Sequence, residues 1–398
     1  MTVRVNKSSF NIREKLSELE RPIGLKGFEL MRAETAQEAG ALLGVGRKNL
    51  IINGDMRIDQ RSNGVSTTPS STSFTSVDRW KAVIYPYSKF SMQRRTDGTV
   101  PGLPSYLRMT TVSAHNVTGS EYQLVWQPIE ARNMFDQTAF GYSGAKDLSL
   151  SFWVRSSVPG PFSGALENQG QNYAYVWEVN IDSANTWEYK TVNIPGLNIG
   201  SWNPMSTSAA AYLMFSLGTN IASSANSGWV NAQRLSSSTE VKRIAISGAT
   251  LDLTGVQLEV GKNATEFEHR SYGEELALCQ RYYQIILDND GTEPDVIGVF
   301  AGRSTSTSNI VFTVPLAVPM RAEPSTTGST VGTIYAYSGG ARVDNSGTGG
   351  LTLNASNEWT PYSSHVLLTA GGFTLTDDRI YNIGGVSTGA FWILDSEL

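Results

Sequence analysis

The chain has 398 residues, of which 17% are charged and 10% are aromatic, and its formal net charge at pH 7 is −5. This length exceeds what one ordinary hydrophobic core organises, so two or three domains are expected. A weakly acidic chain without a basic block gains little from neutralising phosphates, which argues against nucleic acid as a partner. The sequence contains no run of about 18 apolar residues, so no membrane insertion is expected.

Export and covalent cross-linking are constrained by the N-terminus and by the cysteine count. The first residues contain no apolar stretch of the signal-peptide type, so we expect synthesis in a cytoplasm without Sec export. Cys279 is the single cysteine, which excludes an intrachain disulfide framework and a cysteine-rich metal site.

Residues 1–48 differ in composition from the rest of the chain. Residues 13–20 are charged and compatible with a helix, and residues 28–43 are rich in helix formers. Thr35 and Glu38 have the spacing of a capping box. Helices this short are marginal in isolation. We therefore predict a short N-terminal helical arm that orders against other subunits; the alternative is a solvated leader.

From Asn49 onward the sequence has the pattern typical of a β protein. Apolar and polar residues alternate over short stretches separated by Gly, Pro, Asn and Ser, as in an antiparallel β-sandwich. The expected strands cover residues 149–156, 173–181, 188–194, 211–217, 240–246 and 250–260, with a short apolar run at 50–52. Trp153 and Trp177 lie in apolar runs and are assigned to the core. Strands do not alternate with helices, which excludes Rossmann and TIM-barrel folds.

A helix is expected at residues 272–283. Ser271 can cap its N-terminus, with Glu274 at the capping-box position. Strands resume beyond it and predict a second, smaller β domain. These strands are expected at 296–301, 309–314, 330–337, 350–353, 365–369, 373–376 and 389–394. We therefore divide the chain into residues 1–48, 49–272 and 273–398.

Several segments together resemble the tail fibres and related host-recognition proteins of tailed bacteriophages. Residues 49–60 (NLIINGDMRIDQ) and 76–80 (SVDRW) resemble the opening of a jelly roll like those of carbohydrate-binding modules. Residues 151–156 resemble an inner strand of this fold, and residues 254–261 resemble its last strand. The most specific part is 274–283 (EELALCQRYY), which is similar to the helix that leaves the jelly roll in phage fibres. Residues 30–47, 319–321 and 392–398 also fit the pattern.

The resemblance implies a mainly β virion protein that is a homotrimer. Residues 1–48 would contact other virion proteins, residues 49–272 would form a jelly-roll β-sandwich, and the distal C-terminal β-sandwich would face the host. The protein would be made in the host cytoplasm and located in the virion, on the tail or the head.

Sugar binding requires exposed aromatic rings, which cover the apolar face of a pyranose, together with polar groups for its hydroxyls. In the distal domain the candidates are Tyr335, Tyr337, Trp359 and Tyr362, and Tyr335 and Tyr337 share one face of a strand. In the jelly roll they are Trp80, Tyr85, Tyr87, Tyr173 and Tyr175. The alternative for each is packing in the core or in a subunit interface.

Calcium is the one cofactor for which the sequence offers candidates. Jelly rolls of the carbohydrate-binding type can hold Ca²⁺ with oxygen ligands from the first and last strands. Asn53, Asp55 and Asp252 are the residues to test. The alternative is turn chemistry, because Asn-Gly-Asp readily bonds its own backbone.

No catalytic residues are assigned, and an enzyme is not expected. Glycan hydrolysis would need two carboxylates about 5–10 Å apart, and no motif brings two acids together. The acids considered are Asp55, Asp59, Asp78, Glu121, Asp136, Glu178, Glu266 and Glu268. His115, His269 and His365 have no metal-ligand spacing. Cys279 has no nearby histidine and is expected to be a buried thiol.

The function predicted from the sequence is attachment of a virion to the host surface, through a polysaccharide or a protein. A purely structural head-fibre, decoration or baseplate protein remains the alternative, and a glycan depolymerase is a third reading.

Overall fold

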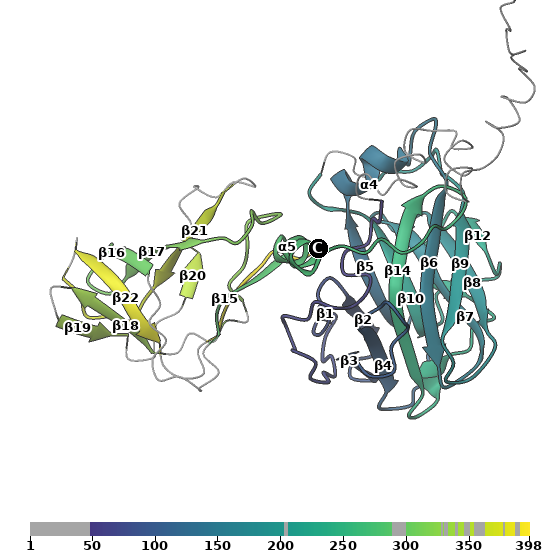
Figure 1. Ribbon diagram of the computed structural model, residues 1–398, viewed down its shortest axis with the longest axis horizontal. Coiled ribbons are helices and arrows are strands. Elements are labelled where there is room, and N and C mark those ends of the chain that lie inside the picture. The colour runs from purple at the N-terminus through teal and green to yellow at the C-terminus, as the bar shows by residue number, and fades with distance from the viewer. Residues whose placement is uncertain are drawn as a thin grey trace, which may run out of the picture. The chain divides into compact units, whose positions relative to one another are not determined.

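The computed structural model describes residues 48–202, 206–288, 300–327, 329, 333–338, 341–345, 351–353, 363–376, 379–386 and 391–398 (Figure 1). The protein is mainly β, with several antiparallel sheets and few helices in these residues. The predicted N-terminal arm, apart from Lys48, lies outside them.

Two sheets form the central β-sandwich. The seven-stranded sheet has the order β1 (Ser73–Phe74), β2 (Lys81–Tyr85), β5 (Tyr122–Glu130), β10 (Ala209–Thr219), β7 (Gly160–Asn168), β8 (Ala174–Ile181) and β12 (Gly228–Val230). The five-stranded sheet has the order β3 (Phe90–Arg95), β4 (Tyr106–Thr111), β14 (Thr250–Val260), β6 (Leu148–Ser156) and β9 (Glu188–Ile194). All pairings within the two sheets are antiparallel.

The core between these sheets is aromatic. Phe152 from β6 meets Phe162, Trp177 and Phe215 from the facing sheet, with ring centroids 5.3–6.2 Å apart. These four side chains are fully buried. Strand alternation explains their convergence, because residues two apart point to the same face of a sheet.

In the described part of the chain, two α-helices and one 3₁₀ turn accompany the sandwich. Helix α4 (Ala131–Thr138) continues directly from β5 and was not expected from the sequence. Helix α5 (Tyr272–Gln280) begins at the predicted capping box, in which Ser271 and Glu274 exchange hydrogen bonds. The 3₁₀ turn η1 (Arg243–Ala245) lies where a strand was predicted at 240–246, so that prediction was wrong. Arg243 explains the difference, because its buried guanidinium donates to several backbone carbonyls instead of facing solvent from a strand.

The opening segment is also not a strand of either sheet. Residues 50–52 have irregular, bent backbone, although the Leu50 N–H donates to the Leu258 carbonyl oxygen at 2.8 Å. The Asn53 side chain organises this segment. Its Oδ1 accepts from the Ile58 N–H, and its Nδ2 donates to the carbonyl oxygens of Ile58 and Asp78. Turn chemistry therefore decides the local structure here.

A second hydrophobic core lies C-terminal to α5. Strand β15 (Tyr283–Asp288) pairs with β23 (Phe391–Asp395). A further seven-stranded sheet has the order β19 (Ala341–Asp344), β18 (Ile334–Ser338), β22 (Ile380–Val386), β16 (Phe300–Ser304), β17 (Ile310–Pro315), β21 (His365–Ala370) and β20 (Leu351–Leu353). The predicted strand at 373–376 is irregular backbone; Phe373 and Leu375 are buried, but they bond the 307–308 backbone without forming a ladder.

Among the helices that the structure describes, none combines the length and the apolar character needed to cross a membrane.

Candidate functional site

The candidate site lies on the outer face of the seven-stranded sheet of the central β-sandwich, which contains β5 and β10. Along β5, Val125 enters the sandwich core, whereas Leu124 and Trp126 point to the opposite face. Tyr212 and Met214 on β10 join them there, and Met214 is the cross-strand partner of Trp126. The outer face therefore carries a hydrophobic cluster of its own.

Four aromatic residues on this face form what we call the aromatic platform: Tyr85, Tyr122, Trp126 and Tyr212. Trp126 and Tyr212 are stacked, with centroids 4.5 Å apart and planes 12° from parallel. Tyr122 is the cross-strand partner of Tyr85, and their ring centroids are 6.4 Å apart. Tyr85 is 53% exposed, and the other three are half-buried. The platform thus spans three adjacent strands, β2, β5 and β10.

Glu167 lies on β7 directly across from Tyr212. It is fully buried, and within the described residues neither of its carboxylate oxygens has a hydrogen-bond partner. Burial raises the pKa of Glu167 to about 8. The backbone N–H of Arg234 offsets this rise only in part, and it does not reach hydrogen-bond geometry. The carboxyl is therefore mostly protonated at pH 7 and can both donate and accept.

Trp126 contributes a second unsatisfied group. Its indole N–H is buried and has no acceptor among the described residues. Buried polar groups without partners are rare and typically cost about 1–3 kcal/mol each. Both groups are closed off from solvent, so a hydroxyl-bearing ligand could partner them only if the side chains around them moved. The platform therefore combines ring faces with unused polar groups that lie just below its surface.

The segment after β10 covers one end of this face. Ile221 and Leu235 pack against the outer cluster, and β11 (Ala222–Ser223) pairs in parallel with β13 (Ser236–Ser237). Ser237 N–H donates to Ser163 Oγ at 2.8 Å, which ties this segment to β7. The accessible part of the face is therefore the part with the platform.

Two of the residues predicted from the sequence lie at the platform. Tyr85 belongs to it, and Tyr87, which is 52% exposed, follows two residues later. Burial raises the pKa of Tyr122, and the neighbouring Tyr87 and Tyr85 raise it further. Gln123 Nε2 donates to the Pro86 carbonyl oxygen at 2.6 Å and holds this turn.

Trp80 and Tyr175 were wrong as sugar-binding candidates, because the structure buries both. Trp80 is inaccessible to solvent; its Nε1 donates to the Asn53 carbonyl oxygen and its ring packs on Phe215. Tyr175 is 7% exposed and donates its hydroxyl to the Asn193 carbonyl oxygen. Tyr173 is half-buried against the sandwich core and does not belong to the platform.

The distal candidates are divided between described and undescribed residues. Tyr335 and Tyr337 alternate with the buried Ile334 and Ala336 on β18 and share its outer face, as predicted. Tyr337 is 39% exposed, and the Arg342 guanidinium lies 4.1 Å from the Tyr335 ring centroid. Trp359 and Tyr362 lie outside the described residues.

The core assignment was right for Trp177 and wrong for Trp153. Trp177 is fully buried. Trp153 lies on the outer face of β6, where it is half-buried and packs on Tyr189 with centroids 5.4 Å apart. Its neighbour Phe152 points into the core instead. Because adjacent residues of a strand point to opposite faces, placing Trp153 in the core was an error of one residue in the strand.

The three calcium candidates do not fit a calcium site in this arrangement. Arg108 and Arg155 hold both carboxylate oxygens of Asp252 at 2.8–2.9 Å. The Asn53 side chain is used by backbone groups, and Asp55 is paired with Arg57. The described residues contain no group of three or more acidic, histidine or cysteine side chains that could hold a metal. Calcium ligands must be free oxygens, and here most are already used.

Sequence reasoning missed Trp126, Tyr212, Tyr122 and Glu167. The alternation in residues 122–130 (YQLVWQPIE) was the available signal. Pro128 argues against a central strand, since proline cannot donate to a ladder. The structure places it near the end of β5, opposite Tyr212. Alternation alone also does not say which face is the core when both faces carry apolar residues.

Comparison with known proteins finds only distant similarity. No protein-family model matches the sequence, and no curated protein matches it significantly. Among solved structures, a candidate sugar-binding protein from Bacteroides thetaiotaomicron is 12% identical with a TM-score of 0.32, over 54% of this chain and 100% of that one. A structure reported for a family 4 carbohydrate-binding module is 11% identical with a TM-score of 0.28, over 52% of this chain and 98% of that one.

A phage protein is also among the similar structures. The enzymatically active domain of tailspike protein 4 from bacteriophage CBA120 is 12% identical with a TM-score of 0.29. The match covers 54% of this chain and 21% of that one. Similarities this remote do not establish a ligand or a function, which must be inferred from the residues themselves.

Proposed function

We propose that this chain binds carbohydrate through the aromatic platform. The observation that carries the proposal is the stacked Trp126–Tyr212 pair beside the buried carboxyl of Glu167, which has no hydrogen-bond partner among the described residues. A sugar presents C–H groups on its ring faces and hydroxyls around its rim. Aromatic faces match the first and unused polar groups match the second. The protonated carboxyl is suited to a neutral polyol, because it can donate to one hydroxyl and accept from another.

We further propose that the protein is a tail-fibre-like virion protein that attaches a tailed phage to its host. This part rests on the resemblance of residues 49–60 and 254–283 to phage fibre segments. A surface polysaccharide is the expected partner, and a homotrimer is the expected assembly. Three linked platforms would raise avidity by about 10²–10⁴ over one weak site. Light scattering should give a trimer of the 43.2 kDa chain; a stable monomer would contradict that part.

Affinity electrophoresis of the full chain tests the binding proposal. The gels would contain purified capsular and O-antigen polysaccharides, or soluble xylan, β-glucan and galactan. We expect at least one polysaccharide to retard the wild-type chain. Trp126→Ala and Tyr212→Ala should each weaken that binding by about two- to tenfold, since a single stacked aromatic contact contributes about 0.5–1.5 kcal/mol and about 1.4 kcal/mol corresponds to a factor of ten.

Tyr189→Ala is the matched control, because Tyr189 is 45% exposed but belongs to the five-stranded sheet. It should bind like the wild type. Platform variants that fold normally and bind every retained polysaccharide as well as the wild type would overturn the proposal.

Attachment and cleavage are separate outcomes. We propose no catalytic activity, so purified protein spotted on a lawn of a host that it labels should give no halo. A halo that disappears in a single carboxylate variant would instead support a depolymerase. Absence of labelling on every host tested by the intact trimer would favour a structural head-fibre or baseplate role.

A further inference from the structure

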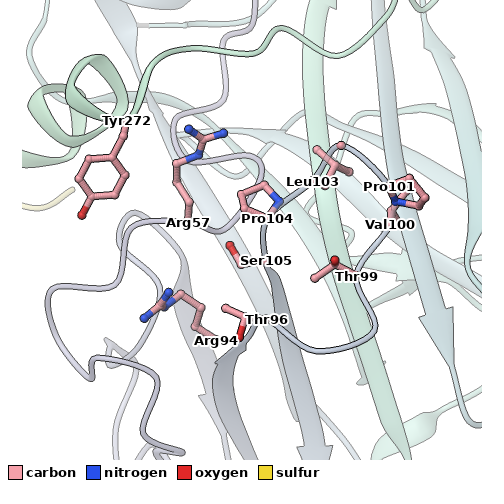
Figure 2. Close-up of a pocket in the computed structure, with 11 residues that line it drawn as sticks. Arg57, Arg94, Thr96, Thr99, Val100, Pro101, Leu103, Pro104, Ser105 and Tyr272 are labelled. Atoms are coloured by element: carbon pink, nitrogen blue, oxygen red, sulfur yellow. The ribbon is translucent and has the colours of Figure 1, made fainter.

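A pocket separate from the platform opens beside the loop between β3 and β4. Its volume is about 660 Å³, within the range of roughly 300–1,000 Å³ that is usual for small-molecule sites. Residues 96 and 99–105 line it, together with Arg57, Arg94 and Tyr272 (Figure 2). None of the platform residues contributes to it.

The two sides of the pocket differ in chemistry. The loop supplies Val100, Pro101 and Leu103, which form an apolar wall. Figure 2 shows Arg57, Arg94 and Tyr272 on the other side. Tyr272 is the first residue of α5 and is 60% exposed, so its ring is available to a ligand.

Arg57 is held by the protein itself. Its guanidinium pairs with Asp55, and its Nη1 donates to the Arg270 carbonyl oxygen at 3.2 Å. This arrangement leaves Arg57 few free donors and makes it a fixed part of the wall.

Arg94 is held far more loosely. Its Nε lies 3.6 Å from Asp59 Oδ2, which is too long for a hydrogen bond. Asp59 is meanwhile satisfied by Ser62 and by the Gly64 N–H, at 2.7–3.0 Å. Within the described residues the Nε of Arg94 is buried without a hydrogen-bond partner. A guanidinium presents paired, parallel donors that fit the two oxygens of a carboxylate.

We propose that this pocket binds a carboxylate-bearing sugar, with the carboxylate on Arg94 and the sugar ring against Tyr272. Thr96 and Thr99 supply hydroxyls at the pocket wall for the remaining polar groups. Asp55 and Asp59 balance the charges of the two arginines. Selection of the acid therefore depends on the directional donors of Arg94 and not on a net positive potential.

Titration calorimetry of the full chain with D-galacturonate and D-galactose tests the proposal. The two sugars share ring stereochemistry and differ in the carboxylate. We expect D-galacturonate to bind at least about tenfold more tightly, and Arg94→Gln to abolish the difference. Arg94→Lys should restore only part of it, because lysine keeps the charge but lacks the paired donors. Titration with oligogalacturonides shows which form the pocket prefers: tighter binding than to D-galacturonate would indicate the end of an acidic glycan, and weaker binding would indicate the free sugar acid.

Arg95→Gln is the matched control. Arg95 is the next residue, but its guanidinium is bound to Asp97 by two hydrogen bonds of 2.8 Å. This variant should keep the preference for the acid. Trp126→Ala should also keep it, so this pocket and the platform can fail independently. Equal binding of the two sugars by the wild type, or equal effects of Arg94→Gln and Arg95→Gln, would overturn the proposal.

Discussion

At the scale of single residues, Glu167 is the least expected group in the central sandwich. A glutamate in a strand normally points to water, and burial without a partner penalises its charged form. The pKa of about 8 follows from that penalty. Glu240, which is also buried, differs because the hydroxyls of Ser216 and Ser236 donate to one of its carboxylate oxygens, Oε1. Within the described residues neither carboxylate oxygen of Glu167 has a partner, which is why we propose it as a binding group.

Glu167 should make folding stability depend on pH. Its pKa is about 8 in the folded chain against the ordinary 4.5, so between these values the folded state binds more protons than the unfolded state. Stability should therefore fall as pH rises from about 4.5 to about 8 and level off above that. The upper limit is about 5 kcal/mol, from about 1.4 kcal/mol per pKa unit.

Glu167→Gln should remove this part of the pH dependence. Urea unfolding of both proteins at pH 5 and pH 8.5 gives the comparison. The variant should gain stability relative to the wild type at the higher pH. A difference between the two proteins that does not change with pH would mean that the carboxyl is solvated or partnered in solution.

At the scale of elements, the closeness of β7 and β10 positions Glu167 beside Tyr212. Gly164 allows this approach. A Cβ at position 164 would collide with the Met214 carbonyl oxygen and with the Trp177 ring. Neither the backbone of a central strand nor a fully buried tryptophan can move away easily.

Gly164→Ala should therefore destabilise the fold by about 1–3 kcal/mol, which is the usual cost of overpacking a well-packed core. Urea unfolding followed by tryptophan fluorescence provides the measurement. Gly273→Ala is the control, because no atom of the described residues lies within 4 Å of a Cβ there and the position is helical. It should stabilise slightly. Equal effects of the two substitutions would show that the strands can separate.

At the scale of the whole molecule, the last residues of the chain complete the central sandwich. Arg79 is 1% exposed, stacks 3.5 Å above the Tyr282 ring centroid and forms an ion pair with Glu397. Arg61 pairs with Asp395 and Glu397 at 3.1 and 3.3 Å. Residues more than 300 positions apart therefore share one buried ionic cluster.

Glu397→Gln should destabilise residues 49–272 by about 3–5 kcal/mol, because it leaves the Arg79 charge buried without its counter-ion. A fragment ending at residue 272 should unfold at a correspondingly lower urea concentration than the same residues in the full chain. Glu323→Gln is the control, since Glu323 is exposed. An unchanged urea midpoint for Glu397→Gln would mean that the ion pair is solvated. Binding experiments should accordingly use the full chain.

Local sequence signals predicted individual elements well where one face is polar. Residues 188–194 and 250–260 form strands with the predicted bounds, and α5 starts at the predicted capping box. These features depend on polar–apolar alternation and on hydrogen bonds between residues three apart, and both can be recognised from the sequence alone. Trp153 and Trp80 show the limit, because the same signals do not reveal how deep a ring will lie.

The sequence by itself determined the mainly β class, the antiparallel pairing and the start of α5, because periodicity and capping are local properties. Tertiary structure alone decided which rings became the platform, that Glu167 is buried without a partner in the described part of the chain, and that Arg79 meets Glu397. Each of these depends on strand order and register, which bring residues such as Trp126, Tyr212 and Glu167 from three separate strands onto one face. Exposure is a property of that assembled face, so no stretch of sequence contains it.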